Sequence, residues 1–547
     1  MGFRSRLSLS LIVALLAVCL CEPVVDGDEK PGASKPATAR VRVTVSKETT
    51  YITEPLRPDG YPDYAAALNK RFSRGVTPQN NAAVFLWKAA GQCDFRKDVY
   101  DVYFRMLGVP PPTGKGNCFT DLEEYAKSRP DAKELLSPVN SPIWLMQYGK
   151  TKKSLWTKKE YSFLADWIMK NERSLDIVVE ASKCPRLWEP LISHPDPTFQ
   201  DPDPDFEKVW VWADLFDFST SASLDSAELT EALRRRATLY AGEGRVDEAW
   251  EDIFALLRLG ELSKQDPLAS FRTDYWYWKE RYACIVAQRL LGFENLSAIK
   301  AARLQRELVQ LPTAPPLSER FDVGLRYACL DLAVMSARQR FSALRKILEK
   351  YLITLPDKAR KRLKSIDEAH IDWDAVLRGI NRWYDRTTSA LRMPHQADRI
   401  AALKKIEKDR DLILEASKDT AGISNEAFLA AVFFKFIGAD IIYKEYQADR
   451  WAMEYDLIKL ALSLAQYHAD HGSYPEKLND LVPSYLEAIR KDIFNDSDLH
   501  YTREGKGYVL YSVGRNGKDD GGKDSAEGGN DIVIRIPDSA RNGDKSQ

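Results

Sequence analysis

The chain has 547 residues, of which 44% are hydrophobic and 29% are charged, and its formal net charge is −1. This composition is that of a globular protein, and the length predicts more than one domain with a sizeable core. The balance of charge excludes a global positive field, so we expect no nucleic-acid partner.

Residues 1–21 have the features of a secretory signal peptide. Arg4 and Arg6 precede an apolar run from Leu7 to Leu20, which suits the core of a signal peptide but is short for a membrane span. Small residues permit cleavage near Cys19. We therefore expect an exported protein of the periplasm or cell envelope. A signal segment that is not removed would also associate the chain with a membrane.

The cysteines that follow this segment lack the CxxC spacing of a zinc site; they are Cys93, Cys118, Cys184, Cys284 and Cys329. In an oxidising compartment Cys93 and Cys118 are close enough in sequence to form a disulfide. The alternative is that all five are small buried side chains.

Residues 22–60 are expected to form a flexible linker that contains one short strand. From Glu22 to Ala39 the chain is polar, rich in Pro, Gly, Ala and Lys, and without apolar periodicity. The stretch RVRVTV, at 40–45, alternates polar or charged residues with Val, which predicts the strand.

Residues 61–450 are predicted to form a helical body. Apolar residues recur at spacings of three and four in NNAAVFLWKAAG, EYSFLADWIMKNERSLDIVVEAS and NRWYDRTTSALRMP. Proline-rich stretches such as GVPPPTGKG and LPTAPPLSERF separate these groups. The pattern favours packed helical pairs and leaves no room for a large parallel sheet.

One segment of this body, residues 232–262, resembles a helical hairpin of the tetratricopeptide (TPR) type. One helix ends at Gly242 to Gly244, and a second carries Ala249, Ile253 and Leu256 on one face. No second copy follows at the expected period, so we predict an irregular α-solenoid of helical hairpins and not a regular array.

The chain shows no catalytic constellation, so no catalytic residue and no organic cofactor is predicted. GVPPPTGK, at 108–115, is not a phosphate loop, because Gly116 stands where Ser or Thr is needed. His468 and His471 could share a helix face, but no third metal ligand is identifiable. The aromatic residues of FRTDYWYWKERYAC, at 271–284, suit either core packing or a binding groove.

The last hundred residues predict a small α+β domain. DRWAMEYDLIKLALSLAQYHADHGSYP is a long amphipathic helix that Gly472 and Pro475 stop. LHYTREGKGYVLYSVG alternates as a hairpin that turns at 504–507, and DIVIRI, at 531–536, supplies a third strand. Residues 538–547 are expected to be a disordered tail.

This order of elements resembles the carboxy-terminal domain of type II secretion major pseudopilins, the G type. The motifs that carry the resemblance are GSYPEKLNDLVP, KDIF, LHYTREGKGYVLYSVG, an acidic Gly-rich loop and DIVI, within residues 451–537. It implies a long helix packed on a three-stranded antiparallel sheet. The whole layout is also similar to that of large exported proteins of planctomycete bacteria, a likeness that implies no activity.

The resemblance implies a calcium ion in the loop after the YSVG strand, at Asn516, Asp519, Asp520 and Asp531. A Gly-rich loop of this length cannot pack on itself, whereas Ca²⁺ takes six to eight oxygen ligands and favours converging carboxylates and carbonyls. Asn516 stands where the family has an acid, so weak affinity is expected. The alternative is a polar connector without a metal.

Assembly into a pseudopilus is not expected, because pseudopilins begin with an apolar helix and this domain lies more than 400 residues from the first residue. The apolar segment 428–442 carries Lys435 and Asp440, so it is expected to be a buried helix.

We therefore expect a mainly α protein that is a non-enzymatic, exported interaction protein of the envelope. It would have protein partners, a calcium-braced carboxy-terminal domain and an association with a secretion assembly. The alternatives are an envelope hydrolase with its active site in the helical body near 271–284, and a genuine type II secretion component.

Overall fold

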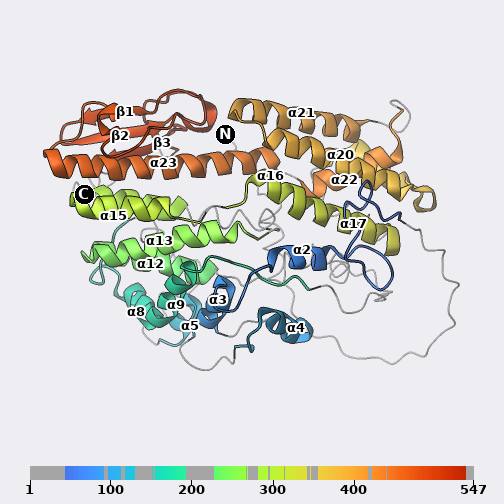
Figure 1. The fold of residues 1–547 in the computed structure, drawn as a ribbon, viewed down its shortest axis with the longest axis horizontal. Coiled ribbons are helices and arrows are strands. Elements are labelled where there is room, and N and C mark those ends of the chain that lie inside the picture. The colour runs from blue at the N-terminus through green and yellow to red at the C-terminus, as the bar shows by residue number, and fades with distance from the viewer. Residues whose placement is uncertain are drawn as a thin grey trace.

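The computed structural model describes residues 43–537, except for 92–96, 113–117, 130–150, 152–153, 193–226, 267, 269–280, 293–295, 313, 340, 342–344, 346–354, 417–421, 439 and 526. The predicted signal peptide at 1–21, the predicted tail at 538–547, Cys93 and most of the aromatic stretch at 271–284 lie outside the described residues. What is described is mainly helical, with a small antiparallel sheet near the carboxyl end, as the sequence predicts (Figure 1).

The elements of the described chain, in order, are α2 (Tyr64–Phe72), α3 (Ala82–Ala90), α4 (Lys97–Leu107), α5 (Leu122–Lys127), α8 (Ser162–Lys170), α9 (Glu172–Ser182), α12 (Ala227–Gly242), α13 (Val246–Ser263), α15 (Ala298–Val309), α16 (Leu317–Arg320), η3 (Phe321–Leu325), α17 (Arg326–Gln339), α19 (Asp357–Ser365), η4 (Glu368–His370), α20 (Trp373–Leu391), α21 (Gln396–Glu415), α22 (Asn425–Ile437), α23 (Ile441–His471), η5 (Leu478–Leu481), β1 (His500–Glu504), β2 (Gly507–Ser512), η6 (Gly514–Asn516) and β3 (Ile532–Ile536).

The hairpin predicted at 232–262 is formed by α12 and α13. Its turn contains Gly244, whose φ of +77° favours glycine. Gly242 is needed for a close approach, because a Cβ there would lie 2.1 Å from the carbonyl oxygen of Trp156. The buried face of α13 includes the predicted Ala249, Ile253 and Leu256. The hairpin therefore forms as its sequence indicates.

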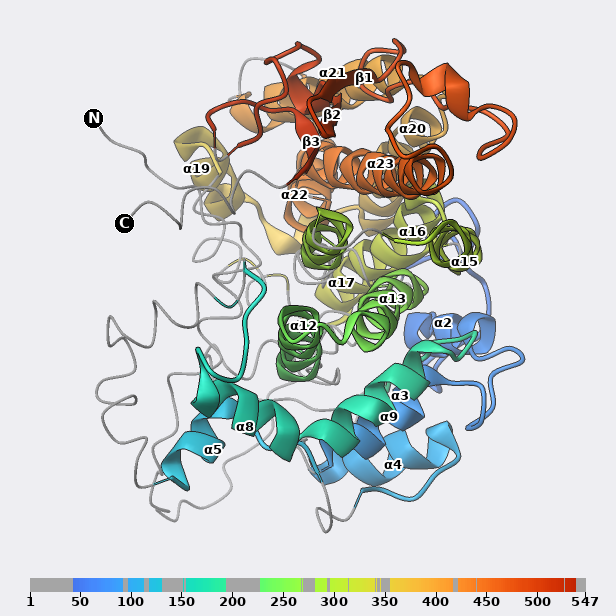
Figure 2. The same cartoon turned by 90° about the vertical axis from the view of Figure 1, so that its left-hand side faces the viewer.

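A buried arginine with two carboxylate partners joins the two helices of this hairpin to the neighbouring α9. The guanidinium of Arg236 on α12 lies 2.7 Å from Asp252 on α13 and 2.7 Å from Asp176 on α9. Burial raises the pKa of Asp252 to about 6, against the lowering effect of Arg236. These ion pairs thus join three helices in the lower part of the molecule, where α3 and α8 also lie (Figures 1 and 2).

A second group of helices, α16, α17, α20, α21 and α22, forms the other part of the body (Figure 1). α20 and α22 approach closely, because a Cβ at Gly379 would lie 2.6 Å from the Cβ of Ala430. The indole of Trp383 stacks on Phe434, with 5.5 Å between ring centroids. α22 is buried along most of its length, which agrees with the buried helix predicted for 428–442, although that segment is interrupted after Ile437.

The carboxy-terminal sheet has the order β1-β2-β3, with both pairs antiparallel. Ile532, Ile534 and Ile536 alternate to one buried face of β3, which packs on α23. Asp492 accepts hydrogen bonds from the hydroxyl of Ser512 and the backbone N–H of Val513, so the segment before β1 is fixed to the end of β2. The hairpin turn at 504–507 and the third strand are confirmed.

The boundary predicted between residues 450 and 451 falls inside α23. α23 is an unbroken helix of 31 residues, and its carboxyl half lies against the sheet and α15 (Figure 1). Its end at Gly472, with φ +72°, is the predicted one. Its amino half, from Ile441, contacts α21.

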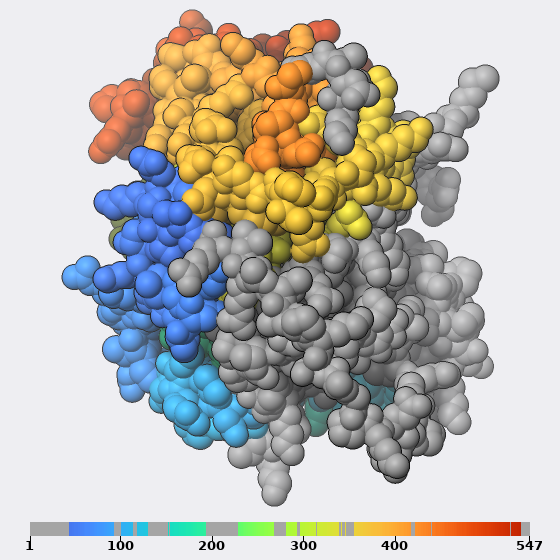
Figure 3. Space-filling model, turned by 90° about the vertical axis from the view of Figure 1, so that its right-hand side faces the viewer, coloured from blue at the N-terminus to red at the C-terminus, as the bar shows by residue number. Residues whose placement is uncertain are grey.

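Residues 43–60 belong to the folded body, and the predicted linker is wrong for them. Residues 43–45 form no strand, and the backbone N–H of Thr44 donates to Asp374 on α20. The side-chain amide of Asn381 donates to the carbonyl oxygens of Glu48 and Thr49. Figure 3 shows this blue segment against the yellow and orange helices. We call residues 43–63 the amino-terminal strap.

No helix among the described residues is both long and apolar enough to cross a membrane.

Candidate functional sites

The loop between β2 and β3 contains the four residues predicted to bind calcium. It leaves the sheet at Gly514, whose φ is +63° and where a Cβ would lie 2.1 Å from the carbonyl oxygen of Asn530. Only glycine fits this close approach of the two ends of the loop. The loop therefore closes on itself next to Asp531, the residue that precedes β3.

Asp531 is buried and collects backbone N–H groups of the loop. One carboxylate oxygen accepts from the N–H of Asp520 at 3.3 Å, and the other accepts from the N–H of Gly522 at 2.8 Å. Burial raises the pKa of Asp531, while these N–H groups act in the opposite direction. Asp531 thus holds the middle of the loop to the start of β3.

Asp520 and Asn516 lie together, whereas Asp519 turns elsewhere. The carboxylate of Asp520 accepts from the side-chain amide of Asn516 at 3.0 Å and from the N–H of Asn530 at 2.8 Å. Asp519 accepts from the hydroxyl of Tyr511 at 3.0 Å and from the N–H of Gly521 at 2.8 Å. The Gly521 N–H is the main cause that lowers the pKa of Asp519.

In this structure the carboxylates of Asp519, Asp520 and Asp531 accept hydrogen bonds from N–H and O–H donors, most of them within the loop. No group of three or more His, Cys, Asp or Glu side chains in the described part of the chain is arranged to hold a metal. The loop is closed here by carboxylate–amide hydrogen bonds.

A second candidate site, which the sequence did not indicate, surrounds Arg326 at the start of α17. The Arg326 side chain is 1% exposed, and its guanidinium lies 2.7 Å from Asp322 and 2.7 Å from Asp385. It also lies over the ring of Tyr51, at 4.2 Å, and near that of Tyr384, at 5.7 Å. We call these five residues the Arg326 cluster.

The backbone around the Arg326 cluster is unusual at two places. Asp322 belongs to η3, a π-helical turn, and such turns are frequent at functional sites. Tyr51 has a φ of +62°, which is rare for a residue other than glycine, and its hydroxyl donates to Asp322 at 3.2 Å. Tyr51 thereby connects the amino-terminal strap to η3 and, through Arg326 and Asp385, to α20.

The charges of the Arg326 cluster are better suited to holding the amino-terminal strap in place than to binding a ligand. The positive charge of Arg326 is already matched by Asp322 and Asp385, and Arg392 approaches Asp322 at 3.4 Å. An incoming anion would have to displace a carboxylate from a buried arginine, which is costly. We interpret the cluster as the lock that fixes the amino-terminal strap to the body.

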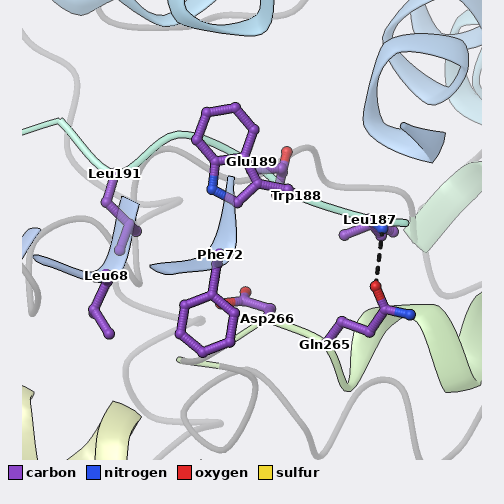
Figure 4. Close-up of a pocket in the computed structure, with 8 residues that line it drawn as sticks. All are labelled: Leu68, Phe72, Leu187, Trp188, Glu189, Leu191, Gln265 and Asp266. Atoms are coloured by element: carbon purple, nitrogen blue, oxygen red, sulfur yellow. Dashed lines mark hydrogen bonds between the residues drawn. The ribbon is translucent and has the colours of Figure 1, made fainter. Parts of the chain in front are cut away.

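A small pocket lies where α2, the segment after α9 and the end of α13 meet (Figure 4). Its lining is mostly apolar, with Phe72 and Trp188 facing it and Glu189 and Asp266 at its margin. The side chain of Gln265 accepts from the N–H of Leu187 at 3.3 Å. The cavity volume is about 10 Å³, room for about one water molecule, so no substrate is proposed for it.

The aromatic stretch at 271–284 is described only from Arg281 onward. The ring of Tyr282 lies under the guanidinium of Arg234, at 5.1 Å, and Ala283 and Cys284 are buried. Ala283 and Cys284 thus belong to the core, and Tyr282 is partly buried beside it.

No protein-family model matches the chain, and neither a curated protein nor a solved structure matches it.

Proposed function

We propose that the chain is a non-enzymatic, exported interaction protein of the cell envelope. In this proposal the helical body is an irregular α-solenoid that presents a pseudopilin-like carboxy-terminal unit to a protein partner, beside a secretion assembly. The observation that supports it best is α23, because one unbroken helix serves both the body and the sheet.

Polar contacts along α23 support a fixed orientation of the sheet. On α21, Arg399 pairs with Glu445 and, at 2.7 Å, with Asp449. Farther along α23, Gln466 donates to Gln305 of α15 at 3.0 Å. A rigid helix held at both ends is what a scaffold needs, whereas a domain that moves on a linker would have none of these contacts.

The pseudopilin-like part rests on the order of elements. α23, the turn at η5, the hairpin of β1 and β2 and then β3 follow the order that the resemblance implies. Calcium remains part of the proposal only as a weak ligand, since Asp519 and Asp520 lie near the loop surface while Asp531 is committed to backbone N–H groups.

The calcium part is tested on the full chain by thermal unfolding in millimolar calcium and in a chelator. Binding to the folded state alone raises the melting temperature by mass action. The gain should disappear in Asp519→Asn/Asp520→Asn and persist in Glu527→Gln. An unchanged melting temperature of the parent chain would leave the loop a connector without a metal.

The interaction part is tested in the cells that make the protein. After fractionation, the chain should be found outside the cytosol. A photo-crosslinking residue at exposed Thr502 on β1 should then capture an envelope protein, whereas one at exposed Lys88 on α3 should not. Protein confined to the cytosol, or equal capture from both positions, would contradict the proposal.

A further inference from the structure

The segment 338–364 has a charge unlike that of the rest of the chain. It contains only two acidic residues, Glu349 and Asp357. Its basic residues are Arg338, Arg340, Arg345, Lys346, Lys350, Lys358, Arg360, Lys361, Arg362 and Lys364. Because the whole chain has a net charge of −1, the remainder is net acidic. This stretch therefore carries a local excess of positive charge, and α19 forms its carboxyl end.

α19 is anchored to the body by one face. Ala359, Arg362 and Leu363 are buried. The guanidinium of Arg362 lies over the ring of Phe428, at 4.6 Å, and donates to the carbonyl oxygen of Ile423 at 2.6 Å. Burial lowers the pKa of Arg362. This one basic residue thus serves packing, and it fixes which face of the helix points outward.

The outward face of α19 is basic. Lys358, Lys361 and Lys364 are exposed, and Arg360 is 40% exposed and pairs with Asp357 at 2.6 Å. Among the described residues no acidic group pairs with Lys358 or Lys361. Two lysines without ion pairs on a rigid helix leave a positive surface. Figure 2 shows α19 at the edge of the molecule, well away from α2 and α3.

We propose that this face of α19 docks on the phosphate headgroups of an anionic membrane surface. Clusters of lysines near a membrane are attracted by its negative surface potential. Each lysine adds to the binding free energy whatever the sequence around it. A single-stranded nucleic acid fits less well, because α19 carries no aromatic side chain on which bases could stack. The choice of a membrane also rests on the export proposed above, which would bring the chain to a lipid surface.

The test is co-sedimentation of the full chain with two kinds of vesicle. One is phosphatidylcholine alone, and the other also contains about 30% phosphatidylglycerol, which resembles an anionic membrane. The parent chain should bind the anionic vesicles more tightly, and 0.5 M salt, at about a 4 Å screening length, should remove the difference. Lys358→Gln/Lys361→Gln should weaken anionic binding about 25-fold, since each lysine contributes about a factor of five.

The matched control is Lys70→Gln/Lys88→Gln, which removes two exposed lysines from α2 and α3. It should bind as the parent does. The parent and both variants share residues 1–42. Any binding through the apolar segment 7–20 is therefore the same in all three proteins, is seen on neutral vesicles as well, and drops out of the comparison. Equal loss in control and test variants, no preference for anionic vesicles, or tighter binding to single-stranded RNA than to vesicles would overturn the proposal. Because vesicle binding does not require secretion, its failure is distinguishable from a failure of export.

Discussion

The indole N–H of Trp451 on α23 donates a hydrogen bond to the carboxylate of Glu261 on α13, at 2.8 Å, and both side chains are buried. The same carboxylate accepts from the ammonium of Lys264 at 2.7 Å and from the N–H of Ala314 at 3.1 Å. Residue 451 is where the sequence placed the start of a separate domain. The contact instead ties α23 to the core of the helical body.

Trp451→Phe should destabilise the protein more than a matched substitution elsewhere. Trp250→Phe is the control, because Trp250 is also buried, at 2% exposed against 9% for Trp451, and its indole nitrogen has no hydrogen-bond partner among the described residues. Both changes lose the same volume, but only Trp451→Phe removes a bond to a charged group, worth about 1.5–3 kcal/mol. The two free energies of unfolding in urea would be compared. Equal losses would mean that the contact contributes nothing to stability.

Arg326→Met should cost about 3–5 kcal/mol of stability, because it leaves the carboxylate of Asp322 without its buried partner. Arg360→Met, which breaks a largely exposed pair with Asp357, should cost at most about 1 kcal/mol. If the Arg326 cluster holds the strap, Arg326→Met should also speed proteolysis within residues 43–63. Unchanged cleavage there would show that other contacts hold the strap.

The pair of acids on α23 predicts a dependence of stability on pH. Burial, and then the charge of Glu445, raise the pKa of Asp449 from its ordinary value of 3.8 to about 7. The folded state therefore holds this proton more tightly, and the resulting stability is present below pH 3.8 and lost as the pH rises through 7. Asp449→Asn cannot titrate, so it should lose less stability than the parent between pH 4 and pH 8. Parallel pH profiles of the two proteins would contradict the assignment.

Asp531→Asn should loosen the carboxy-terminal loop even in a chelator. The amide has one oxygen where the carboxylate has two, so one of the N–H groups of Asp520 and Gly522 loses its acceptor. A loss of about 1–3 kcal/mol is expected, together with faster cleavage between residues 514 and 530. Glu527→Gln, at the exposed tip of the loop, should change neither quantity. If calcium fully restored Asp531→Asn, bracing by these hydrogen bonds would be the wrong explanation.

The carboxy-terminal sheet could be predicted from sequence because its burial alternates along single strands, as in Ile532, Ile534 and Ile536. The start of α23 could not be predicted from the sequence. Its amino half buries Glu445 and Asp449, so it looks polar, and the neutralising Arg399 comes from another helix.

The amino-terminal strap and the Arg326 cluster could not be predicted either, because their polar residues are buried by partners distant in the chain. Thr50 is polar but fully buried, and its hydroxyl has two backbone carbonyls of its own segment as possible acceptors for its one proton. Tyr51 and Asp322 are 271 residues apart in the chain, and neither carries a local motif. A single sequence has no signal for such a pair, whereas co-variation between the two positions could have found it.

Hydrogen exchange along α23 tests most directly whether it couples the sheet to the body. Peptides from residues 441–450 and from 456–466 lie on either side of the predicted boundary and would be followed by mass spectrometry in the native protein and in increasing urea. A single rigid helix predicts that buried amides in both peptides become exposed in one cooperative step, with the same dependence on urea. Exposure of 441–450 at a lower urea concentration, while 456–466 stays protected with the sheet, would contradict the claim and restore two independent domains.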